Sequence, residues 1–352
     1  MSKDMRIGVL GLGFMGATHI QALSKVPNAK LAAVMSRNER RLSGDLSDVQ
    51  GNLGGSVEKA DFSQVVKYRS VEDIIADPEL DAVDVCLPTH LHAPVTIAAL
   101  RAGKHVLVEK PMALDGDAAD EMLVEARKQG RVLMTAQVLR FFPSYQALSK
   151  LVTSGELGSV RSAIFRRRTS VPTWGAWEFD KRKSGGGVYD LMIHDVDMAL
   201  HLFGIPDAIT STGFEDMQSG IDMITSAFHY QNVDSLTITG GWHHRGDYPF
   251  SMEYTVVGDR GVAEFNSSGR PATVYWADGR SEPVDTEGID PFAEELKYFV
   301  ECAQAGREPE MCRPEESAAA VKVTRLMVQA RDTSMAQRVA VTGIERDEPR
   351  RK

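Results

Sequence analysis

The sequence predicts an α/β protein with two domains: an N-terminal doubly wound parallel sheet, and a C-terminal α+β domain built on a large, mostly antiparallel sheet. Three observations lead to this fold class. Short apolar runs alternate with helix-like segments over residues 1–136, which is typical of parallel strands joined by crossover helices. A glycine-rich turn follows the first apolar run. From Asp207 to Trp276 the pattern changes to successive strand-like runs joined by turns.

Length and composition narrow the class of protein. A chain of 352 residues is long for one core, so we expect domains at 1–136 and 137–344 and a charged tail at 345–352. The net charge of -9 argues against nucleic acid or an acidic membrane surface as a general partner. Three cysteines without CxxC spacing fit a reducing compartment. With a first strand at about Met5 and no long apolar run, we expect neither a signal peptide nor a membrane helix, and a cytoplasmic protein.

The glycine turn has the spacing and the context of a dinucleotide fingerprint. A strand, the turn, a helix and a second strand follow one another at residues 6–10, 11–16, 17–25 and 30–35. Gly11 permits the tight turn, Gly13 lets a pyrophosphate approach the backbone, and Gly16 lets the helix pack on the strand. We expect the turn, with its inner residues Phe14 and Met15, to bind a dinucleotide at the helix N-terminus.

The end of the second strand favours NADP. An acidic residue at this place would bond the ribose 2′-hydroxyl of NAD, but the chain has Ser36 followed by Arg37. The guanidinium of Arg37 can hold a 2′-phosphate, and Arg40 and Arg41 lie one turn further on. If Arg37 instead stacks on the adenine or faces solvent, NAD stays open.

Further strands are expected at residues 65–68, 82–87, 106–108 and 132–136, with helices at 71–77, 93–102 and 114–129 and a long surface excursion at 43–62. Ligands of such sheets bind at the carboxyl ends of the strands. Candidate cofactor-binding residues therefore follow the fourth and fifth strands: Leu87, Pro88, Thr89 and His92, then Glu109 and Lys110.

We expect no metal site. His90 and His92 would point in opposite directions in an extended segment, and no third ligand is near them in the sequence. Cys86 is interpreted as a small buried strand residue rather than a nucleophile.

The second half carries a helix of unusual content at residues 188–203, after a run of glycines. Asp190 and His194 are spaced i, i+4, so they share one face, where an aspartate can orient a histidine for acid–base chemistry. Asp197 makes this face more acidic. The alternative is an ordinary ion pair on the helix surface, which is our interpretation of Asp197 and His201.

The rest of the second half is assigned from its periodicity. Helices are expected at residues 143–154, 291–304 and 314–332, and strands at 160–168, 208–212, 223–230, 235–242, 250–258, 261–265 and 273–276. In the first of these strands Arg166 and Arg168 share a face, which could receive an anionic substrate or pair across a subunit interface, although a paired sheet face explains them equally. Trp174 and Trp177 follow in a loop and are candidate pocket residues.

Four motifs resemble the glucose–fructose oxidoreductase / inositol dehydrogenase (Gfo/Idh/MocA) family. They are residues 11–16, Cys86-Leu87-Pro88-Thr89 with His92, residues 103–111 with Glu109-Lys110-Pro111, and Gly186-Gly187 through Asp190 and His194. The resemblance implies a Rossmann domain, an antiparallel sheet that often forms an oligomer interface, and hydride transfer between NAD(P) and a sugar, polyol or related carbonyl compound. The resemblance also implies that Lys110, Asp190 and His194 are the catalytic residues. Many members have Asp in place of Ser36 and use NAD.

These residues define a mechanistic hypothesis. We expect substrate between the nicotinamide and the Asp190–His194 face, with His194 moving the hydroxyl proton and Asp190 orienting it. Lys110 would stabilise alkoxide charge, or carry the proton itself if burial depresses its pKa. A homodimer or homotetramer through the C-terminal sheet is expected. The alternatives are a non-catalytic NAD(P)-binding sensor or scaffold, and an epimerase or lyase that retains its cofactor.

Overall fold

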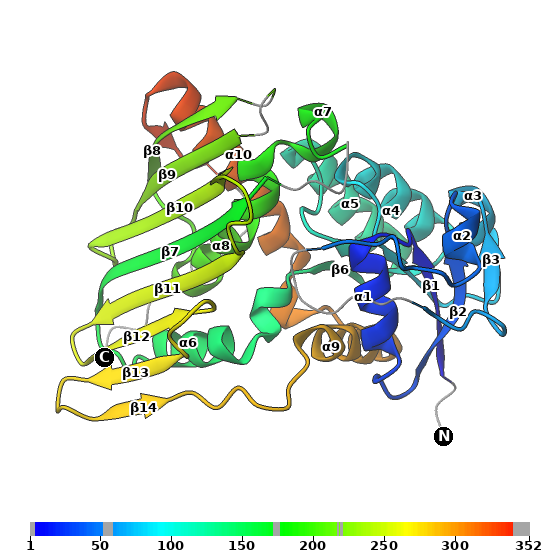
Figure 1. Cartoon of the computed structure of the whole chain (residues 1–352), viewed down its shortest axis with the longest axis horizontal. Coiled ribbons are helices and arrows are strands. Elements are labelled where there is room, and N and C mark those ends of the chain that lie inside the picture. Colours follow the sequence, from blue (N-terminus) through cyan, green and yellow to red (C-terminus); the bar gives the residue numbers. More distant parts are fainter. Residues whose placement is uncertain (1–3, 52–58, 172–176, 217, 219–220, 341–352) are drawn as a thin grey trace. The chain divides into compact units, whose positions relative to one another are not determined.

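The computed structural model describes residues 4–340 except 52–58, 172–176, 217 and 219–220. Its residues separate into two compact units (Figure 1). The first unit consists of Met1–Phe141 and Ile289–Ala318, and the second of Phe142–Gly288 and Ala319–Lys352. The expected tail at 345–352 lies outside the described residues. No helix in the described part of the chain is long and apolar enough to cross a membrane.

The first unit is built on a six-stranded parallel sheet with strand order β3-β2-β1-β4-β5-β6. The strands are β1 Met5–Leu10, β2 Ala29–Met35, β3 Val66–Tyr68, β4 Ala82–Val85, β5 His105–Glu109 and β6 Leu133–Ala136. The chain runs outward from β1 in one direction and from β4 in the other, which is the doubly wound topology expected from the sequence. The point where the order reverses lies between β1 and β4.

Helices connect these strands, and local capping explains where several begin. They are α1 Phe14–Leu23, α2 Glu39–Leu42, α3 Val71–Ala76, α4 His92–Arg101 and α5 Gly116–Gln129, with 3₁₀ turns η1 Thr89–Leu91 and η2 Val138–Phe141. Side chains of Asn38, Ser70 and Asp115 accept backbone N–H groups at the starts of α2, α3 and α5. Gly130 ends α5 in the left-handed conformation. Because right-handed crossovers in opposite directions use opposite faces, the sheet is covered on both sides.

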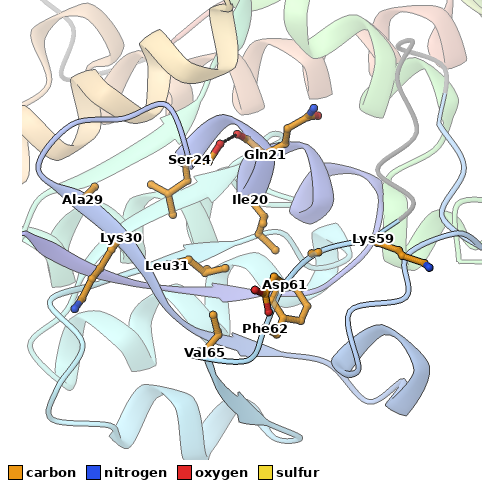
Figure 2. A pocket seen from close by; sticks show the side chains of 12 residues that line it. Ile20, Gln21, Ser24, Ala29, Lys30, Leu31, Lys59, Asp61, Phe62 and Val65 are labelled. Carbon is orange, nitrogen blue, oxygen red and sulfur yellow. Dashed lines mark hydrogen bonds between the residues drawn. The ribbon is translucent and has the colours of Figure 1, made fainter.

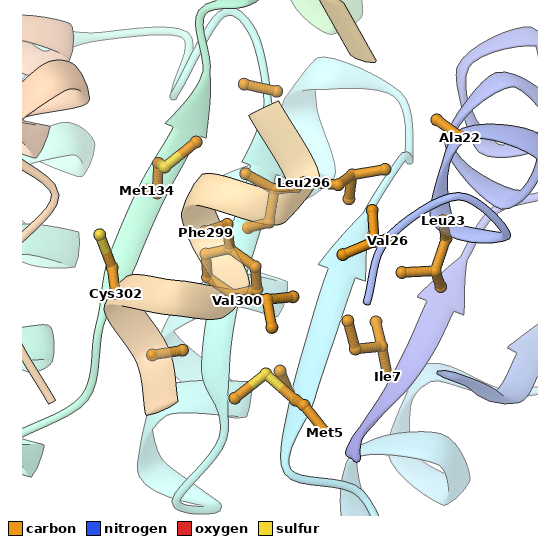
Figure 3. Close-up of a cluster of buried hydrophobic side chains, with 14 of the residues drawn as sticks. Met5, Ile7, Ala22, Leu23, Val26, Met134, Leu296, Phe299, Val300 and Cys302 are labelled. Atoms are coloured by element: carbon orange, nitrogen blue, oxygen red, sulfur yellow. The ribbon is translucent and has the colours of Figure 1, made fainter. Parts of the chain in front are cut away.

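A segment from the C-terminal half completes the first unit. The helix α9 Pro291–Ala305 packs on α1, and it is followed by η3 Glu310–Cys312. Leu296, Phe299 and Val300 of α9 are buried in one apolar cluster with Ile7 of β1 and Met134 of β6 (Figure 3). This differs from the expected continuous second domain of residues 137–344. The amphipathic face of α9 does not say which sheet covers it, so the sequence alone could not assign the helix.

The surface excursion expected at residues 43–62 is partly a core segment. Leu46 and Phe62 are buried with Leu12, Val34 and Leu42 in a second apolar cluster. An isolated bridge between Asp45 and Lys59 closes the segment. Its Gly, Ser and Asp content had suggested exposure, but these few apolar side chains fix both of its ends against the sheet.

The second unit is built on a nine-stranded sheet with order β14-β13-β12-β11-β7-β10-β9-β8-β15. The strands are β7 Val160–Ser170, β8 Ala208–Asp216, β9 Ile221–His229, β10 Ser235–His244, β11 Ser251–Gly258, β12 Gly261–Asn266, β13 Thr273–Trp276, β14 Ser281–Pro283 and β15 Gln337–Arg338. All neighbours are antiparallel except β7 and β10. The sequence predicted this mostly antiparallel sheet but not β14 and β15, which are too short to show a pattern.

Helices cover one face of this sheet. They are α6 Pro143–Thr153, the short α7 Lys181–Ser184, α8 Gly187–Phe203 and α10 Pro314–Thr333, whose first turn belongs to the first unit. The helix α8 packs on β7, β9 and β10. Along β7 the residues Ala163, Phe165, Arg167 and Thr169 are buried, whereas the alternate residues between them are more exposed. The strand therefore turns one face to the helices and leaves the other open.

Candidate functional site

The predicted cofactor-binding segments share one edge of the sheet in the first unit. The N–H of Gly11 donates to the carbonyl of Met35 at 3.0 Å, and the N–H of Cys86 donates to Leu10 at 2.9 Å. The N–H of Ser36 donates to the carbonyl of Tyr68 at 3.1 Å. The glycine turn thus lies between the ends of β2 and β4, at the switch point where ligands of such sheets bind.

The glycine turn fits a dinucleotide. A Cβ atom on Gly16 would lie 1.9 Å from the carbonyl oxygen of Gly11, and one on Gly11 would lie 2.3 Å from that of Cys86. Gly11 also has a φ of +100°. A Cβ on Gly13 would meet no protein atom within 4 Å. Two of the glycines are therefore required by packing inside the protein, whereas the third leaves room for a ligand beside the backbone.

The arginines near the end of β2 differ in their partners. Arg40 binds Asp45 at 2.8 Å, and Arg41 binds Asp48 at 3.0 Å. Arg37 is exposed and makes no hydrogen bond or ion pair within the part of the chain that the structure describes. Of the three guanidinium groups, that of Arg37 is the one whose hydrogen-bonding capacity is left for a ligand.

His92 contacts the backbone of two segments, one that follows β4 and one that follows β5. Its Nδ1 lies 2.8 Å from the carbonyl oxygen of Pro111, and its Nε2 lies 2.7 Å from that of Leu87. The residue is buried, as is Thr89, whereas Leu87 and Pro88 are half-buried. The ring thus links the segment after β4 to the segment after β5. A direct contact between His92 and a cofactor stays a prediction.

Glu109 and Lys110 end β5 at the same edge. Lys110 is half-buried and precedes Pro111 through a cis peptide bond. Its backbone N–H donates to Oε2 of Glu109 at 3.0 Å, and Oε1 of Glu109 lies 3.2 Å from Nε2 of His19. Glu109 therefore turns back into the protein beneath the strand end, and a direct contact between Glu109 and a cofactor stays a prediction.

A buried network of titratable groups, which the sequence analysis missed, lies beneath this edge. His19 of α1 and Asp84 of β4 are 2.8 Å apart, and Cys86 and Glu295 of α9 join them. Burial alone would lower the pKa of His19, but the Asp84 carboxylate raises it well above its usual value. Burial raises the pKa of the Cys86 thiol and that of Glu295. The one signal in the sequence was an aspartate within the apolar run Ala82–Val85.

The helix α8 of the second unit has one accessible stripe. Every residue from Gly187 to Phe203 is buried except Asp190, His194 and His201, which are half-buried. At 100° per residue these three positions lie within about 40° of one another around the helix axis. His201 has a partner within the protein, because its Nε2 lies 3.2 Å from the Ser149 hydroxyl. Asp190 and His194 are the other two half-buried positions of this stripe, and their acid–base role stays a prediction.

Buried ion pairs fix the orientation of α8. The guanidinium of Arg167 donates to both carboxylate oxygens of Asp195, at 2.9 and 3.0 Å. At the helix N-terminus, Asp222 accepts the N–H of Val188 at 2.8 Å and pairs with Arg331. These residues could not be identified from the sequence, because each pair joins strands and helices that are far apart in the chain.

The remaining candidates of the second unit have clear partners or fall outside the description. Arg166 and Arg168 share a face of β7, as predicted, and both pair with Glu253 of β11. This finding favours the paired sheet face over a free anion site. Trp177 is half-buried, and Trp174 lies outside the described residues.

A surface cavity of about 680 Å³ lies away from all of these residues (Figure 2). It is lined by the end of α1, the start of β2 and residues 59–65. Ile20, Leu31, Phe62 and Val65 gather on its apolar side. Because the cavity borders the start of β2 rather than its carboxyl end, we assign it no part in nucleotide binding.

The fold and the glycine turn define a class of protein, the dinucleotide-binding oxidoreductases. Residues 5–137 match the family GFO_IDH_MocA, described as an oxidoreductase family with an NAD-binding Rossmann fold. Residues 145–264 match the GFO/IDH/MocA C-terminal domain. The chain belongs to the Gfo/Idh/MocA family of oxidoreductases, which confirms the resemblance seen in the sequence.

Several relatives named for an activity align with most of the chain. A myo-inositol 2-dehydrogenase of Thermotoga maritima is 29% identical over 87% of this chain and 90% of its own. A D-xylose 1-dehydrogenase (NADP(+)) 2 of Haloferax volcanii is 28% identical over 94% of this chain and 99% of its own. The crystal structure of an aldose-aldose oxidoreductase of Caulobacter crescentus, complexed with glycerol, has a TM-score of 0.81, with 22% identity over 96% and 100% of the two chains. That structure shows the shared fold.

Proposed function

We propose that the protein is an NAD(P)-dependent dehydrogenase or reductase that acts on a CH–OH group of a sugar, a polyol such as an inositol, or a related carbonyl compound. The observation that carries the proposal is the accessible stripe of α8, because Asp190 and His194 are only half-buried on a helix whose other positions, His201 apart, are buried. The similarity to a myo-inositol 2-dehydrogenase and a D-xylose 1-dehydrogenase supports this substrate class.

His194 is the proposed proton carrier. It takes the hydroxyl proton during oxidation and returns it during reduction, the acid–base role that histidine most often fills in enzymes. Asp190, one turn earlier on the same stripe, orients the ring and stabilises its charged form. The buried Arg167–Asp195 pair keeps the helix from rotating, since it holds a position about 100° around the helix from His194 and about 140° from Asp190.

Lys110 is the residue that we propose stabilises the oxyanion of the substrate. Lys110 comes directly after β5, at the sheet edge that is proposed to bind the nucleotide. Its ammonium group can therefore donate a hydrogen bond to the reacting oxygen and stabilise alkoxide charge. Glu109 and His92 hold the backbone on either side of it through Lys110 N–H and the Pro111 carbonyl. The cofactor supplies or accepts the hydride when it is bound.

NADP is the proposed cofactor. Ser36 leaves no carboxylate at the end of β2 to repel a 2′-phosphate, and its hydroxyl accepts the N–H of Asn38 at 3.1 Å. Arg37 has an exposed guanidinium that can bind the phosphate through charge-assisted hydrogen bonds. We propose that the turn of Gly11, Gly13 and Gly16 binds the pyrophosphate.

A substrate panel tests the proposed function. Purified protein is incubated with inositols, aldoses, polyols and uronates, each with NAD and with NADP, and the absorbance of the reduced cofactor is followed. We expect turnover with at least one sugar or polyol. Tight cofactor binding without turnover on any compound would instead favour a sensor or scaffold, and cofactor that co-purifies with the protein would favour net epimerisation or elimination.

We further propose that the open face of the nine-stranded sheet joins copies of this chain. Ile164 on this face of β7 is 46% exposed although it lies mid-strand. Its cross-strand neighbours there are Thr237 and Thr255, which are uncharged. Light scattering of the wild type should give a dimer or tetramer, and Ile164→Glu should shift it toward the monomer. A monomeric wild type at micromolar concentration would contradict the proposal.

A further inference from the structure

Three side chains beneath the glycine turn bring metal-ligating atoms together. His19 extends from α1, Asp84 lies in β4, and Cys86 follows that strand. Their ligand atoms all lie within 4.8 Å of one another. Nδ1 of His19 is 3.6 Å from Sγ of Cys86, and that sulfur is 3.4 Å from Oδ1 of Asp84. His19 is fully buried and Asp84 nearly so, whereas Cys86 is half-buried.

These separations agree with a tetrahedral cation site. Zinc binds nitrogen and oxygen at about 2.0 Å and sulfur at about 2.3 Å, which places tetrahedral ligand atoms about 3.3–3.5 Å apart. The Asp84–Cys86 separation of 3.4 Å falls within this range, and the His19–Cys86 separation of 3.6 Å lies about 0.1 Å above it. The Nδ1–Oδ2 separation of His19 and Asp84 is 2.8 Å, a hydrogen-bond length that a shift of about 0.5 Å in the carboxylate would open. We propose that His19, Asp84 and Cys86 bind one divalent cation of the zinc class.

The other nitrogen of His19 has the environment of a metal ligand. Nε2 lies 3.2 Å from Oε1 of Glu109. Histidines that bind metals through one nitrogen commonly donate the other N–H to a carboxylate, which fixes the ring and its tautomer. In the structure Nε2 does not meet the geometry of a hydrogen bond to Glu109, but with Nδ1 toward the cation a small rotation of the ring would let Nε2–H donate to this carboxylate.

Glu295 is an independent observation that points to a cation. It is fully buried, and neither of its carboxylate oxygens has a hydrogen-bond partner among the described residues. Its electrostatic neighbours are His19, Glu109 and Asp84. Burying a carboxylate without hydrogen bonds costs several kcal/mol unless the charge is compensated. A cation held by His19, Asp84 and Cys86 would compensate this charge from nearby. Glu295 is not among the ligand atoms that lie within 4.8 Å of one another, so a water molecule would complete the coordination.

Charge and donor type select the class of ion. Among the described residues, no lysine or arginine pairs with the acidic side chains in and beside this site, which are Asp84, Cys86 and Glu295. A dication with the Cys86 thiolate, the Asp84 carboxylate and a neutral imidazole forms a core of zero net charge. The mixture of sulfur, nitrogen and oxygen donors suits zinc or cobalt and is unsuited to magnesium or calcium, which prefer oxygen. This site differs from the expectation of no metal, which considered His90 and His92 alone.

Metal content tests the site without reference to activity, so the outcome is separate from that of the proposed function. Tag-free full-length protein is treated with a chelator, loaded with Zn²⁺ or Co²⁺, and passed through a desalting column. We expect one metal ion per chain by elemental analysis. The Co²⁺ form should show the charge-transfer absorption of a thiolate ligand. Protein that retains no metal, or Co²⁺ that binds without a thiolate band, overturns the proposal. The wild-type protein is sufficient for this test.

Matched cysteine variants locate the metal. Cys86→Ala and His19→Gln should weaken Zn²⁺ binding at least tenfold in competition with a chromogenic chelator. Cys302→Ala and Cys312→Ala also remove thiols of the first unit, and both should retain one ion per chain. Circular dichroism confirms that each variant is folded before loading. Zinc that stays bound to folded Cys86→Ala with unchanged affinity overturns the proposal.

Discussion

The guanidinium of Arg167 in β7 donates two hydrogen bonds to the carboxylate of Asp195 in α8, at 2.9 and 3.0 Å, and both side chains are buried. This pair fixes the rotation of the helix about its own axis. Asp190 and His194 occupy the accessible stripe of that helix, so their exposure depends on a contact made elsewhere around its axis.

Asp195→Asn should therefore cost about 3–5 kcal/mol, because it leaves the Arg167 charge buried without its counter-ion. Urea unfolding followed by circular dichroism measures the loss. The control is Asp278→Asn, which breaks the exposed pair with Arg280 and should cost less than about 1 kcal/mol. Equal losses in the two variants would show that the buried pair does not anchor α8.

Two glycine variants separate packing from ligand binding. Gly13→Ala should fold with a loss below about 1 kcal/mol, because its Cβ meets no protein atom, yet it should weaken cofactor binding at least tenfold. Gly16→Ala should destabilise the protein by about 1–3 kcal/mol or more, because its Cβ would lie 1.9 Å from a backbone oxygen. Thermal unfolding and cofactor titration by fluorescence measure both. Normal cofactor affinity in Gly13→Ala would place the pyrophosphate elsewhere.

The choice of cofactor should depend on Arg37. Arg37→Ala should raise the Kd for NADP about 10- to 100-fold and change that for NAD little, since it removes a charge-assisted hydrogen bond to a 2′-phosphate. Arg40→Ala is the matched control because that guanidinium already pairs with Asp45. Isothermal titration of each nucleotide measures the effect. A wild type that binds NAD more tightly than NADP would reverse the assignment.

The docking of α9 on the first unit should depend on pH through Asp290. Burial alone would raise the pKa of Asp290, but its bond to Lys25 at 2.7 Å brings the pKa below its usual value. The folded state thus favours the carboxylate, so this contribution is present above the unfolded pKa of about 4 and is lost as the pH falls through the folded pKa.

Asp290→Asn retains an N-cap for α9 and removes the charge. It should cost up to about 1 kcal/mol at pH 7, and the difference from wild type should shrink toward zero near pH 3. Urea unfolding midpoints at both pH values measure this. Asp290→Ala should cost about 1 kcal/mol more at pH 7, because it also loses the bonds to the N–H groups of Phe292 and Ala293. A difference that grows as the pH falls would contradict the sign.

Local patterns in the sequence predicted most strands and helices and the edge of the first sheet. The turn at Gly11–Gly16 and the i, i+4 spacing of Asp190 and His194 depend only on neighbouring residues, so they could be read directly. The Arg167–Asp195 pair could not, because its partners are 28 residues apart and each is common on a protein surface. The same holds for α9, whose apolar face gives no sign that it packs on the first unit.

The buried network of His19, Asp84 and Glu295 shows a second limit. Each residue lies in a helix or strand that was predicted, but their meeting depends on how α1, β4 and α9 stack. A single aspartate in an apolar strand indicates a buried partner without naming it. Sequence therefore predicts the scaffold better than the long-range charge pairs that fix it.

Lys110 and His194 are proposed to act together on the reacting oxygen, and steady-state kinetics of Lys110→Ala and His194→Ala can decide whether they do. Each variant should lower kcat at least about 100-fold, the usual contribution of an acid–base or oxyanion group, while the Kd for the cofactor changes less than about threefold. The control for Lys110 is Lys128→Ala, because Lys128 is an exposed surface lysine. The control for His194 is His201→Ala, because His201 lies on the same stripe of α8. Both control variants should retain kcat. Wild-type kcat in both Lys110→Ala and His194→Ala would contradict the account.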